Sequence, residues 1–188
     1  FQSMGLAYFG DKNVAVGHSA LQQAGGSSDG TGGDNNVAIG YEAAKATDTG
    51  SNNIAVGYQS LESNTTGEQN VSFGKSLYSN TTGSNNISAG YFALAGNTTA
   101  SNNVAIGAYS MMTNSTGANN VAIGYDALRS STTSTEHLAI GFQAGYSKTT
   151  GNRLLAIGHQ AGFGVTTGHE NIFIGDISGY NVTTGTGN

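Results

Sequence analysis

A glycine returns at nearly constant spacing along this chain and each time closes the same short word, N-N-V-A-I-G or a close variant. Seven of the nine intervals between these glycines are 17 residues, one is 16, and the first is 23, as if six residues were inserted. Such a fixed period predicts a solenoid of stacked coils, an architecture typical of fibres and binding surfaces and seldom of enzymes. The ten glycines are Gly17, Gly40, Gly57, Gly74, Gly90, Gly107, Gly124, Gly141, Gly158 and Gly175.

The repeated word itself predicts a β-strand. In every copy the third residue before the glycine is aliphatic and the residue immediately before it is apolar, with Ala or Ser between them except at Phe173. This alternation places the two large side chains on one face of a strand, and the glycine supplies a corner. A second short strand is expected after the corner, as at residues 58–61, followed by a polar Asn-Thr-Thr-Gly turn. We therefore expect an all-β, parallel β-roll of about ten 17-residue coils.

The small size of one coil argues for association between chains. Each coil offers about three large aliphatic side chains for burial, which is little against the cost of ordering a whole coil. A second source of burial is needed, and oligomerisation along the rod is the simplest. The chain contains no Pro, which fits a continuous hydrogen-bond ladder.

Composition excludes several classes of partner. Only 9% of the residues are charged, so hydroxyl and amide groups must dominate the surface. No basic patch is present, and we expect no nucleic-acid partner. No apolar run is long enough for insertion of this segment into a membrane. Residues 1–4 resemble the remnant of a cleavable tag, and we interpret residues 5–188 as one repeat domain from a longer fibre.

An asparagine lies four residues before most of the repeat glycines. We interpret this column as a ladder of stacked amides, a structural arrangement that identical side chains in register can form. The alternative, direct contact with a ligand, requires the column to face solvent. Its members are Asn13, Asn36, Asn53, Asn70, Asn86, Asn103, Asn120 and Asn171.

Ten tandem copies of this word over residues 5–188 resemble the head repeats of trimeric autotransporter adhesins of the YadA type. Related repeats occur in bacteriophage tail fibres and in fibre proteins of predatory bacteria. The resemblance implies a left-handed β-roll, an intertwined or side-by-side homotrimer, and an extracellular location on a cell surface or a virion tail fibre. The present repeat is longer than that of the adhesins, which lacks the Asn-Thr-Thr-Gly extension, and is closer to phage-type fibres.

The resemblance also implies a function. A segment of this kind is an adhesin or receptor-binding head that recognises a host or prey cell-surface glycan or protein without catalysis, and gains strength from multivalency. Two alternatives are a passive spacer that carries a separate tip domain, and an ice-binding solenoid that uses the recurring threonines. Receptor, organism and flanking domains are not defined by the sequence.

The chain lacks the signatures of catalytic and metal sites. There is no H-x-H or H-E-x-x-H spacing and no recurring carboxylate pair. We therefore expect no catalytic residue, no cofactor and no metal.

The positions that depart from the repeat are the candidates for ligand recognition. The insertion at residues 25–34 contains Asp29 and Asp34 and reads as a surface loop. Phe92 and Tyr109 occupy a column that is mainly polar elsewhere. If this column faces solvent, the two rings would stack one coil apart as a platform for a sugar face, whereas local repacking after the 16-residue interval is the alternative.

Three further departures complete the pattern. An aromatic residue follows several of the corner glycines, as at Tyr41 and Tyr58, and predicts a ladder between coils or between chains. In the last three repeats glycine replaces leucine four residues after the corner, which indicates a different cross-section. Five Asn-x-Ser/Thr sequons fall in the turns and are explained there by turn chemistry without glycosylation: Asn64, Asn80, Asn97, Asn114 and Asn181.

Overall fold

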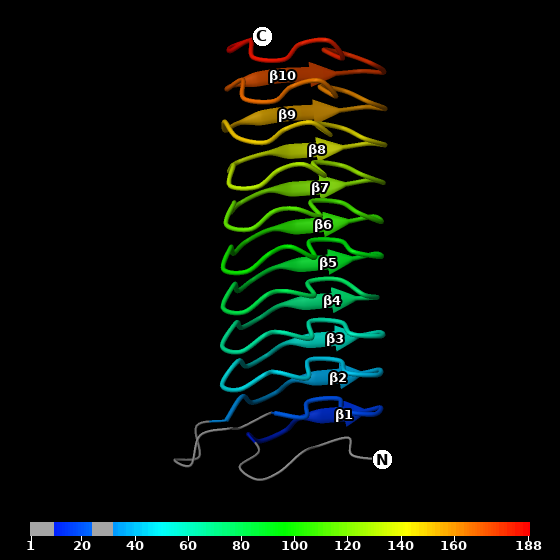
Figure 1. Cartoon of the computed structure of the whole chain (residues 1–188), viewed down its shortest axis with the longest axis vertical. Helices are drawn as coiled ribbons and strands as arrows, with labels where there is room; N and C mark the ends of the chain where they lie inside the picture. The colour runs from blue at the N-terminus through cyan, green and yellow to red at the C-terminus, as the bar shows by residue number, and fades with distance from the viewer. Residues whose placement is uncertain (1–9, 24–31) are drawn as a thin grey trace.

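Ten parallel strands form one sheet in strict chain order, with one strand in each coil of a straight solenoid (Figure 1). A computed structural model describes residues 10–23 and 32–188. The strands are β1 (Val14–Val16), β2 (Val37–Ile39), β3 (Ile54–Val56), β4 (Val71–Phe73), β5 (Ile87–Ala89), β6 (Val104–Ile106), β7 (Val121–Ile123), β8 (Leu138–Ile140), β9 (Leu154–Ile157) and β10 (Asn171–Ile174). The predicted all-β parallel solenoid with coils of about 17 residues is confirmed. The described part of the chain contains no helix capable of crossing a membrane.

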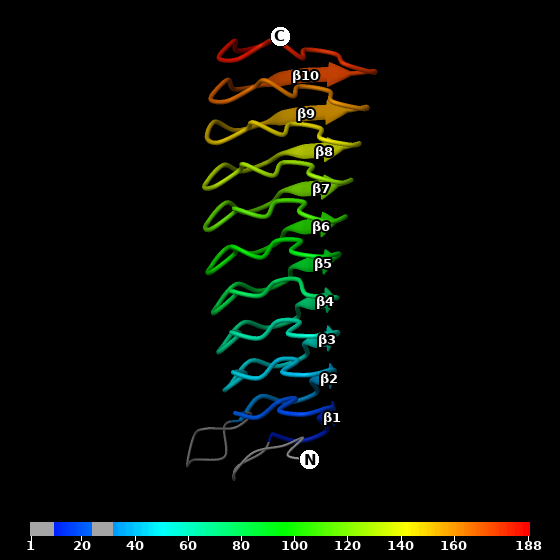
Figure 2. The same cartoon turned by 45° about the vertical axis from the view of Figure 1, so that its right-hand side comes forward.

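The second strand expected in each coil is absent from the described residues. After the corner the chain turns twice, because the second and fourth residues adopt left-handed backbone angles, with φ 51° at Gln59 and 54° at Leu61. These turns still bond to the next coil, as when the Leu61 amide donates to the Ser76 carbonyl at 3.1 Å. Figure 2 shows the outcome, with the strands stacked on one side and the turns on the other.

The large aliphatic side chains of the strands face outward, whereas we expected all the large aliphatic residues of a coil to be buried. In β3 the small Ala55 is fully buried, while Ile54 is 38% exposed and Val56 is partly exposed. The residue that fills the core is Leu61, four residues after the corner. Each coil is thin, so a leucine from the turn side leaves room for only Ala or Ser from the strand. One chain therefore buries about one large aliphatic residue in a regular coil, not three.

The corner glycines meet two separate requirements. Gly107 has φ 123°, a conformation that other residues rarely adopt. A Cβ atom at Gly107 would also lie 2.5 Å from the carbonyl oxygen of Gly124 in the next coil. Gly74, which begins the 16-residue interval, differs: its φ is 82°, and an added Cβ would meet nothing closer than 3.7 Å.

The asparagine column lies inside the solenoid and forms what we call the first amide ladder. The Asn53 Nδ2 donates to the Gly67 carbonyl at 2.9 Å, and its Oδ1 accepts the backbone N–H of Asn70 at 2.9 Å. The same pattern recurs at successive coils, as at Asn103 and Asn120. These side chains are buried, so they stabilise the coil stack and are not exposed to a ligand.

A second amide ladder runs parallel to the first and was not anticipated. It is formed by the asparagines of four predicted turns, all fully buried: Asn64, Asn80, Asn97 and Asn114. The Asn80 Nδ2 donates to the Asn64 Oδ1 at 2.8 Å and to the Gly83 carbonyl at 2.9 Å. The interpretation as turn chemistry is confirmed for these four sequons, since each Nδ2 donates to the carbonyl three residues later, but their side chains are also interior, whereas Asn181 is exposed.

The last coils have a rearranged core. Glycine at Gly145 and Gly162 vacates the leucine position, and two large side chains from other columns occupy the space. Leu154 replaces an asparagine of the first amide ladder, and Phe173 replaces the small central residue of a strand. A Cβ at Gly145 would lie 2.9 Å from Leu154 Cδ2, and one at Gly162 would lie 3.0 Å from Phe173 Cδ2.

This rearrangement has a polar consequence. Leu154 cannot donate a hydrogen bond to the Gly168 carbonyl, as a ladder asparagine would, and neither can Val165, which lies in the column of the second amide ladder. The buried Lys148, in the column of the second ladder one coil earlier, donates its Nζ to the Gly168 carbonyl. The lysine thus satisfies a carbonyl that both ladders have left without an amide donor.

Candidate binding surfaces

An apolar face runs along the outside of the sheet from β1 to β10. It consists of the outward side chains of the strands, and it includes Val16 at 55% exposure and Ile39 and Ile106 at 40%. Because the strands are in register, the same positions stack from coil to coil. Contiguous apolar surface of this extent is uncommon on a soluble monomer and marks a surface that associates with another molecule.

An aromatic column lies immediately after the corner glycines. The rings of His18, Tyr41 and Tyr58 stack with centroids 5.4 Å apart and planes within 11°. Farther along the rod Tyr125 and Phe142 stack at 5.5 Å, and Phe142 stacks in turn on His159 at 5.3 Å. The expected ladder of rings between coils is therefore present within one chain.

Three coils lack an aromatic residue at this position, where they have Lys75, Ala108 and Asp176, and the first two gaps are bridged. Lys75 Nζ lies 5.4 Å from the Tyr58 ring centroid and 5.2 Å from that of Phe92, as a cation–π bridge. Ala108 leaves the second gap, which Tyr109 fills with edge contacts to Tyr91 at 5.7 Å and to Tyr125 at 5.9 Å. Phe92 and Tyr109 thus continue the aromatic column. Their own position in the repeat, which is mainly polar in other coils, did not reveal this role.

The Phe92 and Tyr109 rings lie together but are only half-exposed. Their centroids are 6.4 Å apart and their planes within 10°. Lys75 covers the Phe92 ring from the preceding coil, and the Arg129 guanidinium lies 5.3 Å from the Tyr109 centroid in the following coil. A sugar stacks on an open ring face, so it would have to displace one of these cations. This geometry favours local repacking.

The aspartates of the insertion divide between described and undescribed residues. Asp29 lies in residues 24–31, outside the described residues. Asp34 accepts the backbone N–H of Asp11 through Oδ1 at 2.6 Å, and its own N–H donates to the Ser51 hydroxyl at 3.0 Å. In this structure Asp34 therefore ties neighbouring coils together.

The threonines lie in turns, and none of the ten strands of the described chain contains one. The first threonine of a turn bonds to the next coil, as Thr65 Oγ1 does to the Thr81 carbonyl at 3.0 Å. The second, such as Thr66 or Thr99, is exposed. The result is a single threonine column along a ridge and not a flat strand array.

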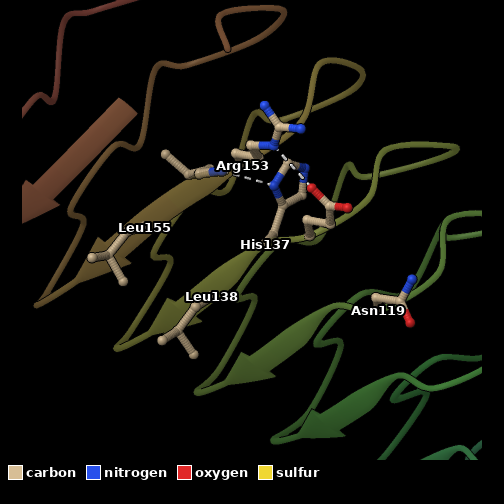
Figure 3. Close-up of a pocket in the computed structure, with 7 residues that line it drawn as sticks. Asn119, His137, Leu138, Arg153 and Leu155 are labelled. Carbon is tan, nitrogen blue, oxygen red and sulfur yellow. Dashed lines mark hydrogen bonds and ion pairs between the residues drawn. The ribbon is translucent and has the colours of Figure 1, made fainter. Parts of the chain in front are cut away.

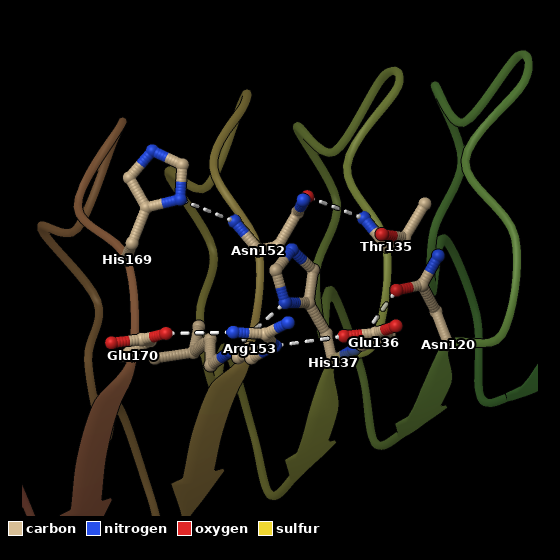
Figure 4. A network of polar contacts seen from close by, with 9 residues as sticks. Asn120, Thr135, Glu136, His137, Asn152, Arg153, His169 and Glu170 are labelled. Atoms are coloured by element: carbon tan, nitrogen blue, oxygen red, sulfur yellow. Dashed lines mark hydrogen bonds and ion pairs between the residues drawn. The ribbon is translucent and has the colours of Figure 1, made fainter.

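A polar cluster interrupts the regular surface near β8 and β9. Arg153 pairs through Nε with Glu136 at 3.0 Å and through Nη1 with Glu170 at 2.7 Å, which raises the pKa of Arg153 (Figure 4). Beside it, Asn152 N–H donates to His169 Nδ1 at 3.2 Å. All of these side chains are exposed. Exposed ion pairs of this type contribute little to stability and much more to the charge pattern of a surface.

An open hollow of about 380 Å³ adjoins this cluster (Figure 3). Leu138 and Leu155 lie on neighbouring strands and give it an apolar side, while the ion pair of Glu136 and Arg153 borders it. The hollow therefore belongs to the apolar face at the point where that face meets the charged cluster. Its full lining is Asn119, Glu136, His137, Leu138, Arg153, Leu154 and Leu155.

Two ionisable side chains are buried beneath this surface. His137 Nδ1 accepts the backbone N–H of Leu154 at 3.0 Å, so the ring proton is on Nε2, which is buried without a hydrogen-bond partner of good geometry. Burial, assisted by the positive charge of Lys148, lowers the pKa of His137 to about 3. Burial also lowers the pKa of Lys148 to about 8. Neither residue forms an ion pair with a described carboxylate.

Within residues 10–23 and 32–188, no group of three or more His, Cys, Asp or Glu side chains is placed to hold a metal ion. Comparisons with protein-family models, with curated proteins and with solved structures found no match for this chain.

Proposed function

We propose that this chain is a segment of a trimeric extracellular fibre in which the apolar faces of three copies pack against one another. The observation that carries the proposal is the length of that face: every coil directs branched or aromatic strand residues outward, as at Ile54 and Ile106. Covering a half-exposed Val or Ile contributes about 1 kcal/mol, so covering most of the face contributes on the order of ten kcal/mol or more per chain. This burial supplies what a single chain lacks.

The repeated word supports the rest of the proposal, since it resembles the heads of trimeric adhesins. In such a fibre the turn side of each coil, rich in Thr, Ser and Asn, faces outward from all three copies. We propose that this surface recognises a host or prey cell-surface glycan or protein through neutral hydrogen bonds repeated on three chains. Binding of this kind depends little on salt, because the chain has few charges.

A passive spacer is the second candidate. It is favoured by the regularity of the coils and by the cations that cover the Phe92 and Tyr109 rings, since this removes the most evident platform for a sugar. In this case the segment holds a separate tip domain away from the surface that anchors the fibre.

Light scattering after gel filtration tests the assembly. The unmodified chain should have three times the monomer mass. The double variant Ile54→Glu/Ile106→Glu should be monomeric, because six charges would enter one apolar interface of the trimer. The matched control, Thr99→Glu/Thr116→Glu, adds the same charge to exposed turns and should stay trimeric. A monomeric unmodified chain, or a trimeric isoleucine variant, would overturn the proposed assembly.

Binding of the isolated trimer to intact cells and to a glycan array separates the two functions. Saturable binding that persists at high salt supports recognition by this segment. The absence of binding on both supports the spacer and refutes the adhesin.

A further inference from the structure

One position of the first amide ladder is titratable. Each ladder asparagine accepts the backbone N–H of the following coil, as Asn103 Oδ1 does from Asn120 at 3.0 Å and Asn120 Oδ1 from His137 at 3.0 Å. At the next step the acceptor is the imidazole Nδ1 of His137, which takes the N–H of Leu154 at 3.0 Å (Figure 4). An amide oxygen accepts at any pH, whereas an imidazole nitrogen accepts only when it is deprotonated.

Apart from a backbone hydrogen bond with Gly151, which raises its pKa, the surroundings of His137 disfavour its protonated form. Asn120 faces it from the preceding coil and Leu154 from the following one, and both are neutral. The charged group nearest to it in the interior is Lys148, a cation. Glu136 and Arg153 lie on the outer surface and pair with each other. Protonation would therefore place two cations in the interior and set an N–H donor against the N–H of Leu154.

The coils around His137 also lack other side-chain hydrogen bonds in the interior. Leu154 does not continue the first amide ladder, and Val165 does not continue the second. The carbonyl of Gly168 depends on Lys148 for its side-chain donor. What remains between these coils is the backbone ladder between β8 and β9 and that of the turns, with side-chain bonds outside the core such as those of Thr132 to the Thr149 carbonyl and of Gln160 to Gln143. Loss of the His137–Leu154 hydrogen bond would thus weaken the stack at a place where few interior side-chain hydrogen bonds join adjacent coils.

We propose that mild acid loosens the solenoid between β8 and β9 because protonation of His137 removes the acceptor of the Leu154 N–H, so that the C-terminal coils open while the coils before them stay closed. The device is an acid-sensitive hinge built into a regular rod. It depends on the fold of one chain and not on the proposed trimer or its receptor.

The expected size follows from proton linkage. The pKa of His137 is held at about 3 in the closed coil and returns toward its ordinary value of 6.5 when the coil opens. The closed state is therefore fully favoured above pH 6.5 and loses this advantage as the pH falls from 6.5 toward 3. In that window the opening equilibrium rises by up to about tenfold per pH unit, and by about fifteenfold between pH 6.5 and 5.0. Lys148, whose pKa is about 8, stays protonated throughout and adds no slope.

Backbone hydrogen–deuterium exchange at pH 6.5 and 5.0, corrected for the intrinsic exchange rate, measures this opening. In the unmodified chain, amides from residue 154 onward should lose about fifteenfold protection at pH 5.0, and amides of residues 54–123 should keep theirs. His137→Asn, which restores the acceptor used in other coils, should remove the difference. The same loss of protection in His137→Asn, or no loss in the unmodified chain, would overturn the proposal.

Two controls separate this hinge from other effects of acid. His169→Asn replaces a nearby exposed histidine that accepts the Asn152 N–H, and should leave the pH response intact; loss of the response in this variant would assign the hinge to the wrong residue. Light scattering at both pH values follows the assembly. A mass change shared by the unmodified chain and His137→Asn would trace the response to assembly and refute the hinge, whereas unchanged mass with local opening supports it.

Discussion

The exchange of core residues near β9 makes a quantitative prediction about Gly145 and Leu154. Leu154 is buried and occupies the space that a leucine at position 145 would fill in a regular coil. Leu154→Asn alone should leave a cavity and destabilise the chain by about 3 kcal/mol. Gly145→Leu alone should destabilise it by about 2 kcal/mol, since its Cβ would lie 2.9 Å from both Leu128 Cδ2 and Leu154 Cδ2.

The double variant should recover most of this loss. Leucine at 145 would fill the cavity, as Leu61 and Leu128 do in their own coils at similar left-handed φ. Asparagine at 154 would donate to the Gly168 carbonyl as Asn120 does to Ser134. Independent effects would sum to about 5 kcal/mol, whereas compensation should bring the total below about 2 kcal/mol, a coupling of about 3 kcal/mol.

Urea unfolding of the four chains measures the coupling through the shift of the transition midpoint. Gly145→Ala/Leu154→Asn is the matched control, because it adds a Cβ at position 145 without the volume needed to fill the cavity, and it should not be rescued. Additive losses in the leucine-containing double variant would show that Gly145 and Leu154 do not share one space, and would refute the explanation of the altered coils.

Three further predictions follow from single positions. Gly107→Ala should destabilise the chain by about 3 kcal/mol or more, and Gly74→Ala by about 1 kcal/mol, because the alanine Cβ would clash with the next coil only at Gly107; equal melting temperatures would contradict this. Asn103→Ala should cost about 2–4 kcal/mol in urea unfolding, since the buried Gly117 carbonyl and Asn120 N–H lose a partner, while Thr99→Ala at an exposed turn should cost less than about 0.5 kcal/mol. The unmodified chain should gain about 1.4 kcal/mol per pH unit between pH 8 and 10.5 relative to Lys148→Gln, because the unfolded lysine binds a proton that the folded one releases; parallel pH profiles would exclude this effect.

The period predicted the architecture because it depends on backbone geometry that every coil shares. A glycine such as Gly107 must recur wherever the chain makes a corner against the corner of the next coil. The asparagine ladder was predicted for a similar reason, since stacked identical residues bond to one another in any stack of parallel coils. Neither prediction required knowledge of which side chains face inward.

The alternation of large and small residues did not reveal which face of each strand points to the core. The pattern of Ile54, Ala55 and Val56 requires the two large residues to share a face, but it does not say whether that face is the core or the surface. The usual preference of branched residues for the interior gave the wrong answer, because Leu61 already fills a thin coil. The cue lay in the central residue, which is Ala or Ser in every strand but β10 and marks a position with little room for a side chain.

The rearranged coils show what a reading of separate columns leaves out. Glycine at 145, lysine at 148 and leucine at 154 each look like an isolated departure from the repeat. Their departures coincide within one period, and in a stacked coil residues from different columns of adjacent turns share one interior. When one column has glycine in place of leucine, a side chain from another column must fill the space. If that side chain stands where a ladder asparagine would be, a residue of a third column must supply the missing hydrogen-bond donor. The two buried ionisable residues at this place, Lys148 and His137, therefore lie where the interior had already departed from the regular coil, which is why an acid-sensitive group is tolerated there and in no described coil with an intact asparagine ladder.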